Sequence, residues 1–254
     1  MAPTDSERGR ARQRHTGGGD YFLHITTFQP KVEEKSPQNV LGIDFGIDKQ
    51  LTLSNGLDIR EGMMPTKRIR HTHRELSRRK RHGKNWRKTQ SRLNREYNRI
   101  GNQKMDIKNK LVSKLVSTYE IIKVQNDCFR GWQTMWGRKV QASAIGGIMS
   151  ALKERAHTLV EAPRFVATTK LCSRCGAERE IGLKERVYQC HNCGLRIDRN
   201  FNSALNILNW DVVPAERREL TPVDTSASVG MMEYFNSIPN VSASLVVETG
   251  SQRP

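Results

Sequence analysis

The feature that most constrains the fold of this chain is a set of four cysteines in two C-x-x-C pairs. Cys172 and Cys175 form the first pair, Cys190 and Cys193 form the second, and fourteen residues separate them. A glycine directly follows each pair, which allows the tight turns that aim backbone amides at sulfur. The sequence therefore predicts a zinc ribbon over residues 171–195, with a structural ion whose closed sulfur shell leaves no position for substrate.

Charge is the second constraint, because the 254 residues carry a formal net charge of +17. Residues 67–104 contain fifteen Lys or Arg but only Glu75 and Glu96, a local balance of +13. Apolar residues recur there at helical spacing, and Gly83 is expected to divide a basic helical segment over 67–118 into two helices. Such a stripe predicts contacts with a phosphate backbone, without sequence preference, although a solvated basic face is the alternative. The candidate nucleic-acid-binding residues are Arg74, Arg78, Arg79, Lys80, Arg81, Lys84, Arg87, Lys88, Arg92, Arg95 and Arg99.

Short apolar segments predict a sheet mixed with helices, and hence an α/β fold. Strands are indicated over 21–28, 40–46, 119–127 and 158–166, with a hairpin around Ser54-Asn55-Gly56. Helices are indicated over 138–156 and 202–210. The expected organisation is a disordered basic leader over 1–19, a core over 20–170, the ribbon over 171–195, a final motif and helix over 196–210, and a poorly ordered tail over 211–254.

The sequence also restricts where the protein acts. It has no apolar run long enough to span a membrane, and its Arg- and Gly-rich N-terminus lacks the apolar segment of a secretory signal. Cysteines in metal-binding spacing are typical of a reducing compartment. We therefore expect an intracellular protein associated with nucleic acid and not with a membrane.

Acidic residues at strand ends are candidates for metal-dependent chemistry. Cleavage of a phosphodiester by metal ions needs carboxylates from separate elements that meet at one edge of a sheet. Asp44 lies in GIDFG at the end of a predicted strand, and Asp127 follows the predicted strand IIKVQ. A third ligand is expected near 198–200, where Asp198 could instead cap the helix that begins around Asn202. Taken singly, each aspartate is at least as typical of a turn or a cap.

Together these motifs resemble the TnpB proteins of insertion sequences. The resemblance rests on LGIDFG, RELSRRKRHGKN, TTKLCSRCG, the second C-x-x-C-G and DRNFNSALNI, and it covers about residues 20–210. It implies a compact RNA-guided DNA nuclease related to type V CRISPR effectors, with an RNase H-like (RuvC) domain and an inserted four-cysteine zinc ribbon. In that family the Asp of GIDxG, here Asp44, is the first magnesium ligand. A Glu at the end of a later strand is the second, and the Asp of a D-R-D-x-N-A type motif is the third.

The chain departs from this pattern in three places. Gln125 stands where most relatives carry the second acidic residue, and Asp127 is the candidate substitute. The last motif reads Asp198-Arg199-Asn200, so an amide fills the third ligand position. About 39 residues precede GIDFG, where the family carries a wedge-like β-barrel and a helical domain. We therefore expect an N-terminally truncated member.

Three functions stay open at this point. The first is a transposon-associated protein that binds DNA and guide RNA, with magnesium-dependent cleavage impaired because Asn200 and Gln125 replace carboxylates. The second is an active RNA-guided DNA endonuclease that uses Asp44, Asp127 and Asp198. The third is a truncated transposon remnant with a fold but without selected activity.

Overall fold

The chain forms two units, which differ in their dominant secondary structure. The computed structural model describes residues 10–15, 21–26, 39–61, 67–164, 166–182, 185–211 and 225–246. One unit, called here the basic unit, contains Met1–Lys35 and Met64–Met105, and the other, called the sheet unit, contains Ser36–Met63 and Asp106–Pro254. No helix within the described residues combines the length and the apolar character needed to cross a bilayer.

The sheet unit is built on a mixed six-stranded sheet in the order β10-β5-β4-β3-β6-β7. Its strands are β3 (Val40–Phe45), β4 (Leu51–Leu53), β5 (Leu57–Glu61), β6 (Ile121–Gln125), β7 (Thr158–Ala162) and β10 (Val241–Leu245). The first three are antiparallel in series, β6 and β7 run parallel to β3, and β10 pairs antiparallel with β5. The predicted α/β fold with an antiparallel hairpin is therefore confirmed.

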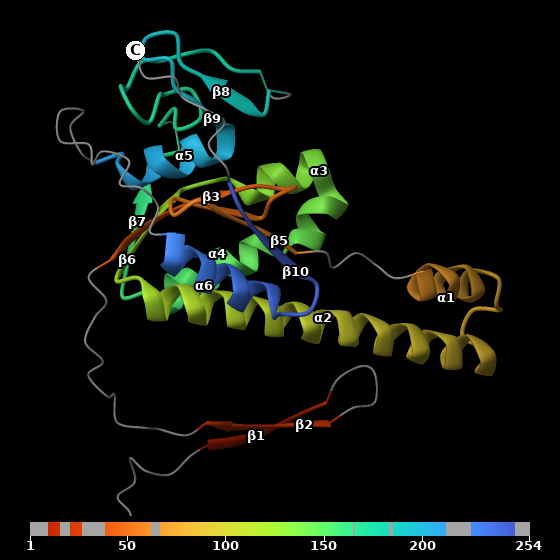
Figure 1. The fold of residues 1–254 in the computed structure, drawn as a ribbon. Coiled ribbons are helices and arrows are strands. Elements are labelled where there is room, and N and C mark those ends of the chain that lie inside the picture. Colours follow the sequence, from red (N-terminus) through yellow and green to blue (C-terminus); the bar gives the residue numbers. More distant parts are fainter. Residues whose placement is uncertain are drawn as a thin grey trace, which may run out of the picture. The chain divides into compact units, whose positions relative to one another are not determined.

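Helices cover both faces of this sheet (Figure 1). They are α3 (Phe129–Ser143), α4 (Ile145–Arg155), α5 (Arg199–Leu208), α6 (Thr225–Asn236) and the C-terminal turns of α2 (Lys84–Thr118). In Figure 1, α5 lies on one face of the sheet, and α4 and α6 lie on the other. The buried residues Leu41, Ile43, Leu53 and Ile122 contribute the central core.

Gly42 determines how closely α5 approaches the sheet. A Cβ at this position would lie 2.4 Å from the Ala204 carbonyl oxygen and 2.8 Å from the Leu208 amide nitrogen. Only glycine allows that contact between backbones. Since side chains alternate along a strand, Asp44 two residues later faces the same helix. The sequence Gly-Ile-Asp thus brings a carboxylate against the first turns of α5.

The helix predicted over 138–156 is in fact two helices. α3 already begins at Phe129, and Ala144, with a left-handed φ of 52°, separates it from α4. The four-residue apolar spacing continues across the break because Val140 and Ile148 are both buried, one in each helix. A spacing that reflects burial alone does not reveal a change of helix direction.

The prediction of a poorly ordered tail over 211–254 is wrong for its described part. α6 buries Met231 and Phe235, and β10 extends the edge of the sheet beside β5, with Val241 and Ala243 buried. The apolar period is hard to read in the sequence because serine, threonine and glycine surround these residues. Residues 212–224 and 247–254 of the predicted tail lie outside the described residues.

The prediction of a disordered leader over 1–19 is likewise wrong where the structure describes it. Arg10–His15 form strand β1, which pairs antiparallel with β2 (Tyr21–Thr26). The strand predicted over 21–28 corresponds to β2. The sequence of β1, RARQRH, lacks the alternation of apolar and polar residues that would predict a strand. The other residues of the predicted leader lie outside the described part of the chain.

The basic unit contains the helices predicted on either side of Gly83. α1 spans Lys67–Ser77, and α2 begins at Lys84. The predicted break is therefore confirmed. The zinc-ribbon segment of the sheet unit contributes two short antiparallel strands, β8 (Val187–Gln189) and β9 (Arg196–Asp198).

Candidate functional site

A cavity of about 520 Å³ opens where β3 and β6 end side by side. Asp44 lines it from β3, Gln125 and Asp127 line it from the end of β6, and Asn200 lines it from α5. The parallel register that pairs Ile43 with Val124 places Asp44 next to Gln125 at this edge. Three predicted site positions, Asp44, Asp127 and Asn200, thus meet in one cavity.

Two of the three carboxylates that line the cavity have raised pKa values. Burial raises the pKa of Asp44 to about 7, although the Ser203 hydroxyl, which donates to Asp44 Oδ1 at 2.9 Å, lowers it; the negative charge of Asp127 raises it further. Burial also raises the pKa of Asp127 to about 6, against the opposing effect of Arg164. Two such groups close together are a charge arrangement that a bound cation would stabilise.

Gln125, at the position where the resemblance leads us to expect a carboxylate, uses both its oxygen and its nitrogen in hydrogen bonds. Its Oε1 accepts from the Thr168 hydroxyl at 2.9 Å, and its Nε2 donates to the carbonyl oxygens of Arg164 at 3.1 Å and Val166 at 2.9 Å. The Thr168 hydroxyl oxygen also lies 3.1 Å from the hydroxyl oxygen of Ser203, the partner of Asp44. A carboxylate at position 125 could not donate to the two carbonyls, so the amide ties the loop after β7 to the sheet edge.

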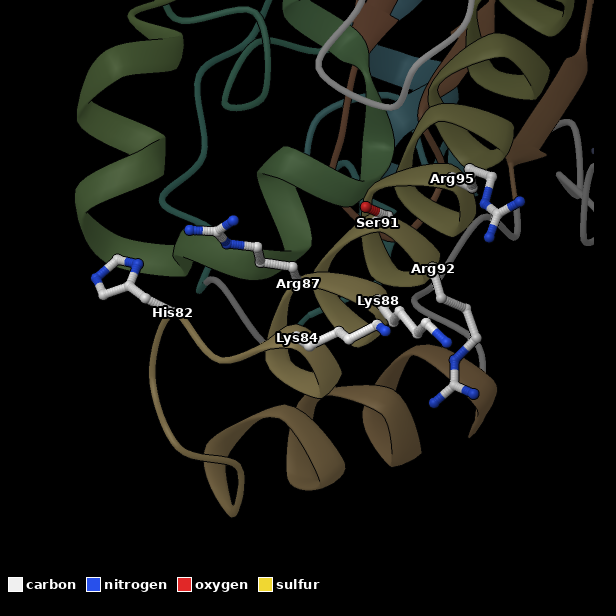
Figure 2. A pocket seen from close by; sticks show the side chains of 7 residues that line it. All are labelled: His82, Lys84, Arg87, Lys88, Ser91, Arg92 and Arg95. Atoms are coloured by element: carbon white, nitrogen blue, oxygen red, sulfur yellow. The ribbon is translucent and has the colours of Figure 1, made fainter.

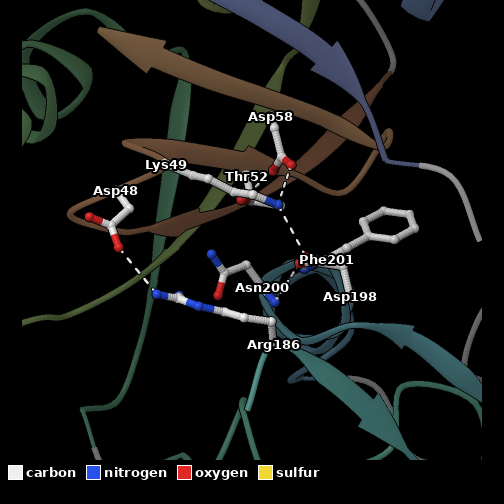
Figure 3. A network of polar contacts seen from close by, with 8 residues as sticks. All are labelled: Asp48, Lys49, Thr52, Asp58, Arg186, Asp198, Asn200 and Phe201. Carbon is white, nitrogen blue, oxygen red and sulfur yellow. Dashed lines mark hydrogen bonds and ion pairs between the residues drawn. The ribbon is translucent and has the colours of Figure 1, made fainter. Parts of the chain in front are cut away.

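Asp198 acts as the N-cap of α5 (Figure 3). Its Oδ1 accepts from the backbone amides of Asn200 at 2.9 Å and Phe201 at 3.2 Å. Its Oδ2 accepts from Lys49 Nζ at 3.1 Å, and Lys49 also pairs with Asp58 at 2.5 Å. The expected cap is confirmed. Asp198 does not belong to the described residues that line the cavity.

Cations surround the carboxylates. Lys49, Lys139, Arg186 and Arg199 line the cavity, and Figure 3 shows Arg186 reaching across to Asp48 beside Asn200. Asp48, the other acidic residue of the lining, pairs with Arg186 at 3.1 Å and Lys139 at 3.8 Å. The cavity therefore combines oxygen ligands suited to a divalent cation with positive groups suited to a phosphate.

Sequence reasoning missed the aromatic lining of the same cavity. Trp132 and Trp136 line it from α3, together with Lys139. Their signal in the sequence is the run FRGWQTMW, which starts two residues after Asp127 and spaces its rings by three and four positions. This spacing places the rings on one face of a helix.

The four predicted zinc ligands form one cluster. Their sulfur atoms all lie within 4.8 Å of one another, with Cys172 to Cys193 at 3.6 Å and Cys175 to Cys190 at 3.5 Å. Tetrahedral zinc, with Zn–S bonds of about 2.3 Å, separates its sulfurs by about 3.8 Å. The glycines after the two pairs have φ values of 73° and 69°, the left-handed turns that the motif predicts. The four thiols therefore fit a structural zinc ion.

The ribbon packs on α5 through an apolar cluster and through side-chain amides. Tyr188 and Ile197 of the ribbon share this buried cluster with Phe201 of the helix. Asn202 Nδ2 donates to the Leu171 carbonyl at 2.7 Å, and its Oδ1 accepts from the backbone amide of Ser173 at 3.0 Å, beside the first cysteine. The metal module is thus joined directly to the helix that carries Asn200.

In the basic unit, cations follow one face of α2 around a hollow of about 700 Å³ (Figure 2). The hollow is lined by His82, Lys84, Arg87, Lys88, Ser91, Arg92 and Arg95. Of the eleven predicted nucleic-acid-binding residues, nine are exposed; Arg79 and Arg92 are half-buried and both pair with Glu75. These eleven residues are called the basic stripe below.

Comparisons with known proteins agree with these features. A family model described as "Probable transposase" matches residues 24–126, and one described as "Cas12f1-like, TNB domain" matches residues 148–207. A "Putative RNA-guided DNA endonuclease" of Streptomyces pristinaespiralis is 28% identical over 200 residues, covering 75% of this chain and 50% of that protein. "TnpB-like protein L79" of Acanthamoeba polyphaga mimivirus is 24% identical over 226 residues, covering 76% of this chain and 41% of that protein. The chain thus spans half or less of the length of these relatives.

Among solved structures, a chain of the "Cryo-EM structure of the Cas12f1-sgRNA-target DNA complex" aligns with a TM-score of 0.42 and 13% identity, covering 81% of this chain and 66% of that chain. The two family models are more informative, because the first covers Asp44 and the sheet edge, and the second covers the ribbon and α5. The chain is thus similar to the TnpB/OrfB_IS605 family, and its residues 148–207 are similar to a Cas12f1-like TNB domain.

Proposed function

We propose that this chain is a nucleic-acid-binding protein of TnpB type whose RNase H-like (RuvC) domain cleaves DNA only weakly. The observation that carries the proposal is the meeting of Asp44, Asp127 and Asn200 at one sheet edge, with two carboxylates and one amide. Metal-dependent phosphodiester cleavage requires acidic groups from separate elements at such an edge. The Streptomyces relative, described as an RNA-guided DNA endonuclease, supports guide RNA and DNA as the partners.

The donor set fits magnesium. Mg²⁺ prefers carboxylate oxygens and keeps several waters. Asp44 and Asp127 would hold it, and the side-chain oxygen of Asn200 would be a neutral third ligand. Bound there, the ion would stabilise negative charge on the attacking and leaving oxygens of a phosphodiester. Because Asp48 is paired with Arg186 and Lys139, the donor set carries two negative charges, which suits one divalent cation better than two.

Other side chains orient these ligands and attract the substrate. The Ser203 hydroxyl holds one oxygen of Asp44 in place, and Gln125 holds Thr168, the second partner of that hydroxyl. Arg199 and Lys139 lie on the cavity wall, where positive charge attracts a phosphate group. The exposed cations of the basic stripe supply the larger share of affinity for a duplex or an RNA–DNA hybrid.

The geometry favours weak cleavage over full activity through Asp198. Both oxygens of Asp198 have partners, namely two amides of α5 and the Lys49 ammonium. Turning this carboxylate towards a metal would remove the helix cap, which is typically worth about 1 kcal/mol, and would also break the ion pair. Asn200, which lines the cavity, therefore stays the third group of the set.

The deciding experiment restores the missing charge at position 200. Asn200→Asp should raise magnesium-dependent cleavage of labelled single-stranded DNA about a hundredfold, or about 2.7 kcal/mol, because one more ligand charge allows a second cation to bind. It should also raise the number of Mn²⁺ ions bound, as counted by electron paramagnetic resonance. Asp44→Ala should remove both the residual cleavage and the bound Mn²⁺.

A matched control is Asn126→Asp, the same chemical change at an exposed residue next to Asp127 that does not belong to the cavity lining. It should change neither readout. Robust cleavage by the unaltered chain that is abolished by Asp44→Ala and not raised by Asn200→Asp would overturn the proposed impairment. Failure of both forms to bind Mn²⁺ would instead favour a remnant without activity.

A further inference from the structure

Aromatic rings form a continuous series from the sheet edge to the cavity mouth. The ring centroids of Phe45 and Phe129 lie 5.6 Å apart, those of Phe129 and Trp132 lie 5.3 Å apart, and those of Trp132 and Trp136 lie 6.4 Å apart. All three pairs are edge-to-face, the arrangement in which aromatic rings stabilise one another. Phe45 directly follows Asp44, so the series begins beside the candidate metal ligand.

Exposure increases along this series. Phe45 is 4% exposed, Trp132 is half-buried, and Trp136 is 39% exposed. The inner rings therefore hold the outer indole in place while part of it stays open to solvent. Both tryptophans line the same cavity as Asp44. A large aromatic group fixed at the mouth of a cavity is available to a ligand in that cavity.

The surrounding charge indicates which ligand this is. Lys139, three residues after Trp136, and Arg199 line the cavity beside the indoles. A polyanionic strand is the ligand that combines phosphates for these cations with flat, polarisable bases for the rings. An apolar protein surface would gain nothing from the cations. A duplex would keep its bases stacked on one another and would present only its backbone.

We propose, building on the proposed function, that Trp136, supported by Trp132, stacks on an unpaired base of the strand whose phosphate enters the cavity at Asp44. This contact would tolerate any base, because every base has an aromatic face. It would fix the strand next to the site of chemistry, whereas the basic stripe contacts only backbone phosphates. The site therefore selects single-stranded over paired nucleic acid.

Binding to short oligonucleotides tests this assignment. The probes are fluorescein-labelled oligothymidylate and an abasic oligonucleotide of the same length, which has phosphates but no bases. Trp136→Ala should weaken binding of oligothymidylate about 5- to 150-fold and leave binding of the abasic probe unchanged, since one base–aromatic stack is worth that range. Trp136→Phe should recover part of the loss.

Met135 provides the matched control, because it is 69% exposed and directly precedes Trp136. Met135→Ala should have no effect on either probe. An equal loss on both probes, or an equal loss for Met135→Ala and Trp136→Ala, would overturn the stacking assignment and indicate a general apolar surface. Photocrosslinking of an iodouracil-containing strand should place the base on Trp136 or Trp132, and a crosslink confined to α2 would contradict the proposal.

The binding assay contains no divalent metal, so its outcome does not depend on cleavage. A chain that never cleaves DNA still shows base-dependent affinity if Trp136 stacks. Conversely, a chain that cleaves but binds both probes equally would leave the proposed function standing and would overturn the stacking proposal. The two failures are thus distinguishable.

Discussion

The basic stripe and the cavity at the sheet edge are assembled in opposite ways. The stripe takes its cations from α1, from α2 and from the short segment between them, all between residues 74 and 99. The cavity takes Asp44 from β3, Asp127 from the end of β6, and Asn200 from α5, and it depends on the sheet to bring them together. The stripe is thus a local feature of the sequence, and the cavity is a product of the fold.

This difference predicts different responses to change. In the stripe many similar charges face solvent, so each contributes a small share of a summed attraction. In the cavity several side chains are held by specific hydrogen bonds, as the three of Gln125 demonstrate. Substitutions should therefore have graded effects in the stripe and abrupt effects in the cavity.

Removing the zinc should abolish metal binding in the cavity and leave duplex binding by the basic stripe unchanged. A structural zinc contributes roughly 10 kcal/mol or more to the folding of its module. The double change Cys175→Ser and Cys193→Ser should lower zinc from about one ion per chain to none. It should also release α5, and with it the Mn²⁺ binding at Asp44, because Asn202 and Phe201 join that helix to the ribbon.

The control for this change is Cys128→Ser, since Cys128 is exposed and lies outside the cluster. Zinc content is measured by mass spectrometry, Mn²⁺ binding by electron paramagnetic resonance, and affinity for duplex DNA by fluorescence anisotropy. Duplex affinity should change little in either variant. Undiminished Mn²⁺ binding in the zinc-free variant would contradict the dependence of the cavity on the ribbon.

The second largest expected effect is a difference between the two regions in how strongly their nucleic-acid affinity depends on salt. Duplex affinity through the stripe should fall about 10³- to 10⁵-fold between about 50 and 200 mM salt, because six to ten phosphate contacts each release a counterion. The base-dependent part of single-strand binding, which is the difference between the thymidylate and abasic probes, should change far less. Anisotropy titrations at several salt concentrations measure both. A flat duplex response would exclude the stripe as the binding face.

Gln125→Glu should destabilise the fold by about 1 kcal/mol, the lower end of the cost of leaving polar groups without their hydrogen bonds, because these groups are only partly buried. The new carboxylate would face the carbonyl oxygens of Arg164 and Val166, which the amide now satisfies. Although it restores the residue type expected from the family, it should not increase Mn²⁺ binding. Denaturant unfolding measures the change.

Gln189→Glu is the matched control, because Gln189 is an exposed glutamine of β8. Its effect should stay within about 0.5 kcal/mol. A Gln125→Glu protein that is as stable as the unaltered chain and binds more Mn²⁺ would show that position 125 is a metal-ligand position after all.

The pH dependence should follow the raised pKa values of Asp44 and Asp127. The folded chain holds protons on these groups that the unfolded chain releases near the ordinary pKa of 3.8, so without metal its stability should fall as the pH rises towards about 7. Mn²⁺ competes with those protons, and its affinity should fall about tenfold from about pH 8 to pH 6. Asp44→Asn should flatten the stability profile, whereas Asp106→Asn, at an exposed acid of α2, should not. A stability that rises over this range would contradict the burial of Asp44.

The sequence predicted those parts of the molecule that depend on neighbouring residues. The two cysteine pairs, the helix break at Gly83 and the cap at Asp198 are local, and the structure contains all three. The carboxylates could be proposed because strand ends in a sheet share an edge. Gln125 could not be interpreted, because the carbonyls it satisfies lie about forty residues further along the chain.

Two other features escaped prediction for related reasons. Trp132 and Trp136 have helical spacing, but only the fold places α3 beside Asp44. β10 is a short segment of alternating serine and apolar residues, and it pairs with β5 next to α6, which buries Phe235. In both cases the deciding contact joins elements that are distant in sequence.

The smallest expected effect belongs to a single cation of the stripe. Arg95→Gln removes one of the exposed charges beside the hollow of α2. Duplex affinity should fall only about threefold, and the slope of log affinity against log salt should decrease by about one, uniformly across sequences. Lys110→Gln, on the same helix but paired with Asp106 at 2.7 Å, should leave both quantities unchanged. A loss of more than about tenfold, or one confined to particular sequences, would mean that Arg95 makes a specific base contact. Single substitutions in the stripe would then have abrupt effects, as we expect for the cavity.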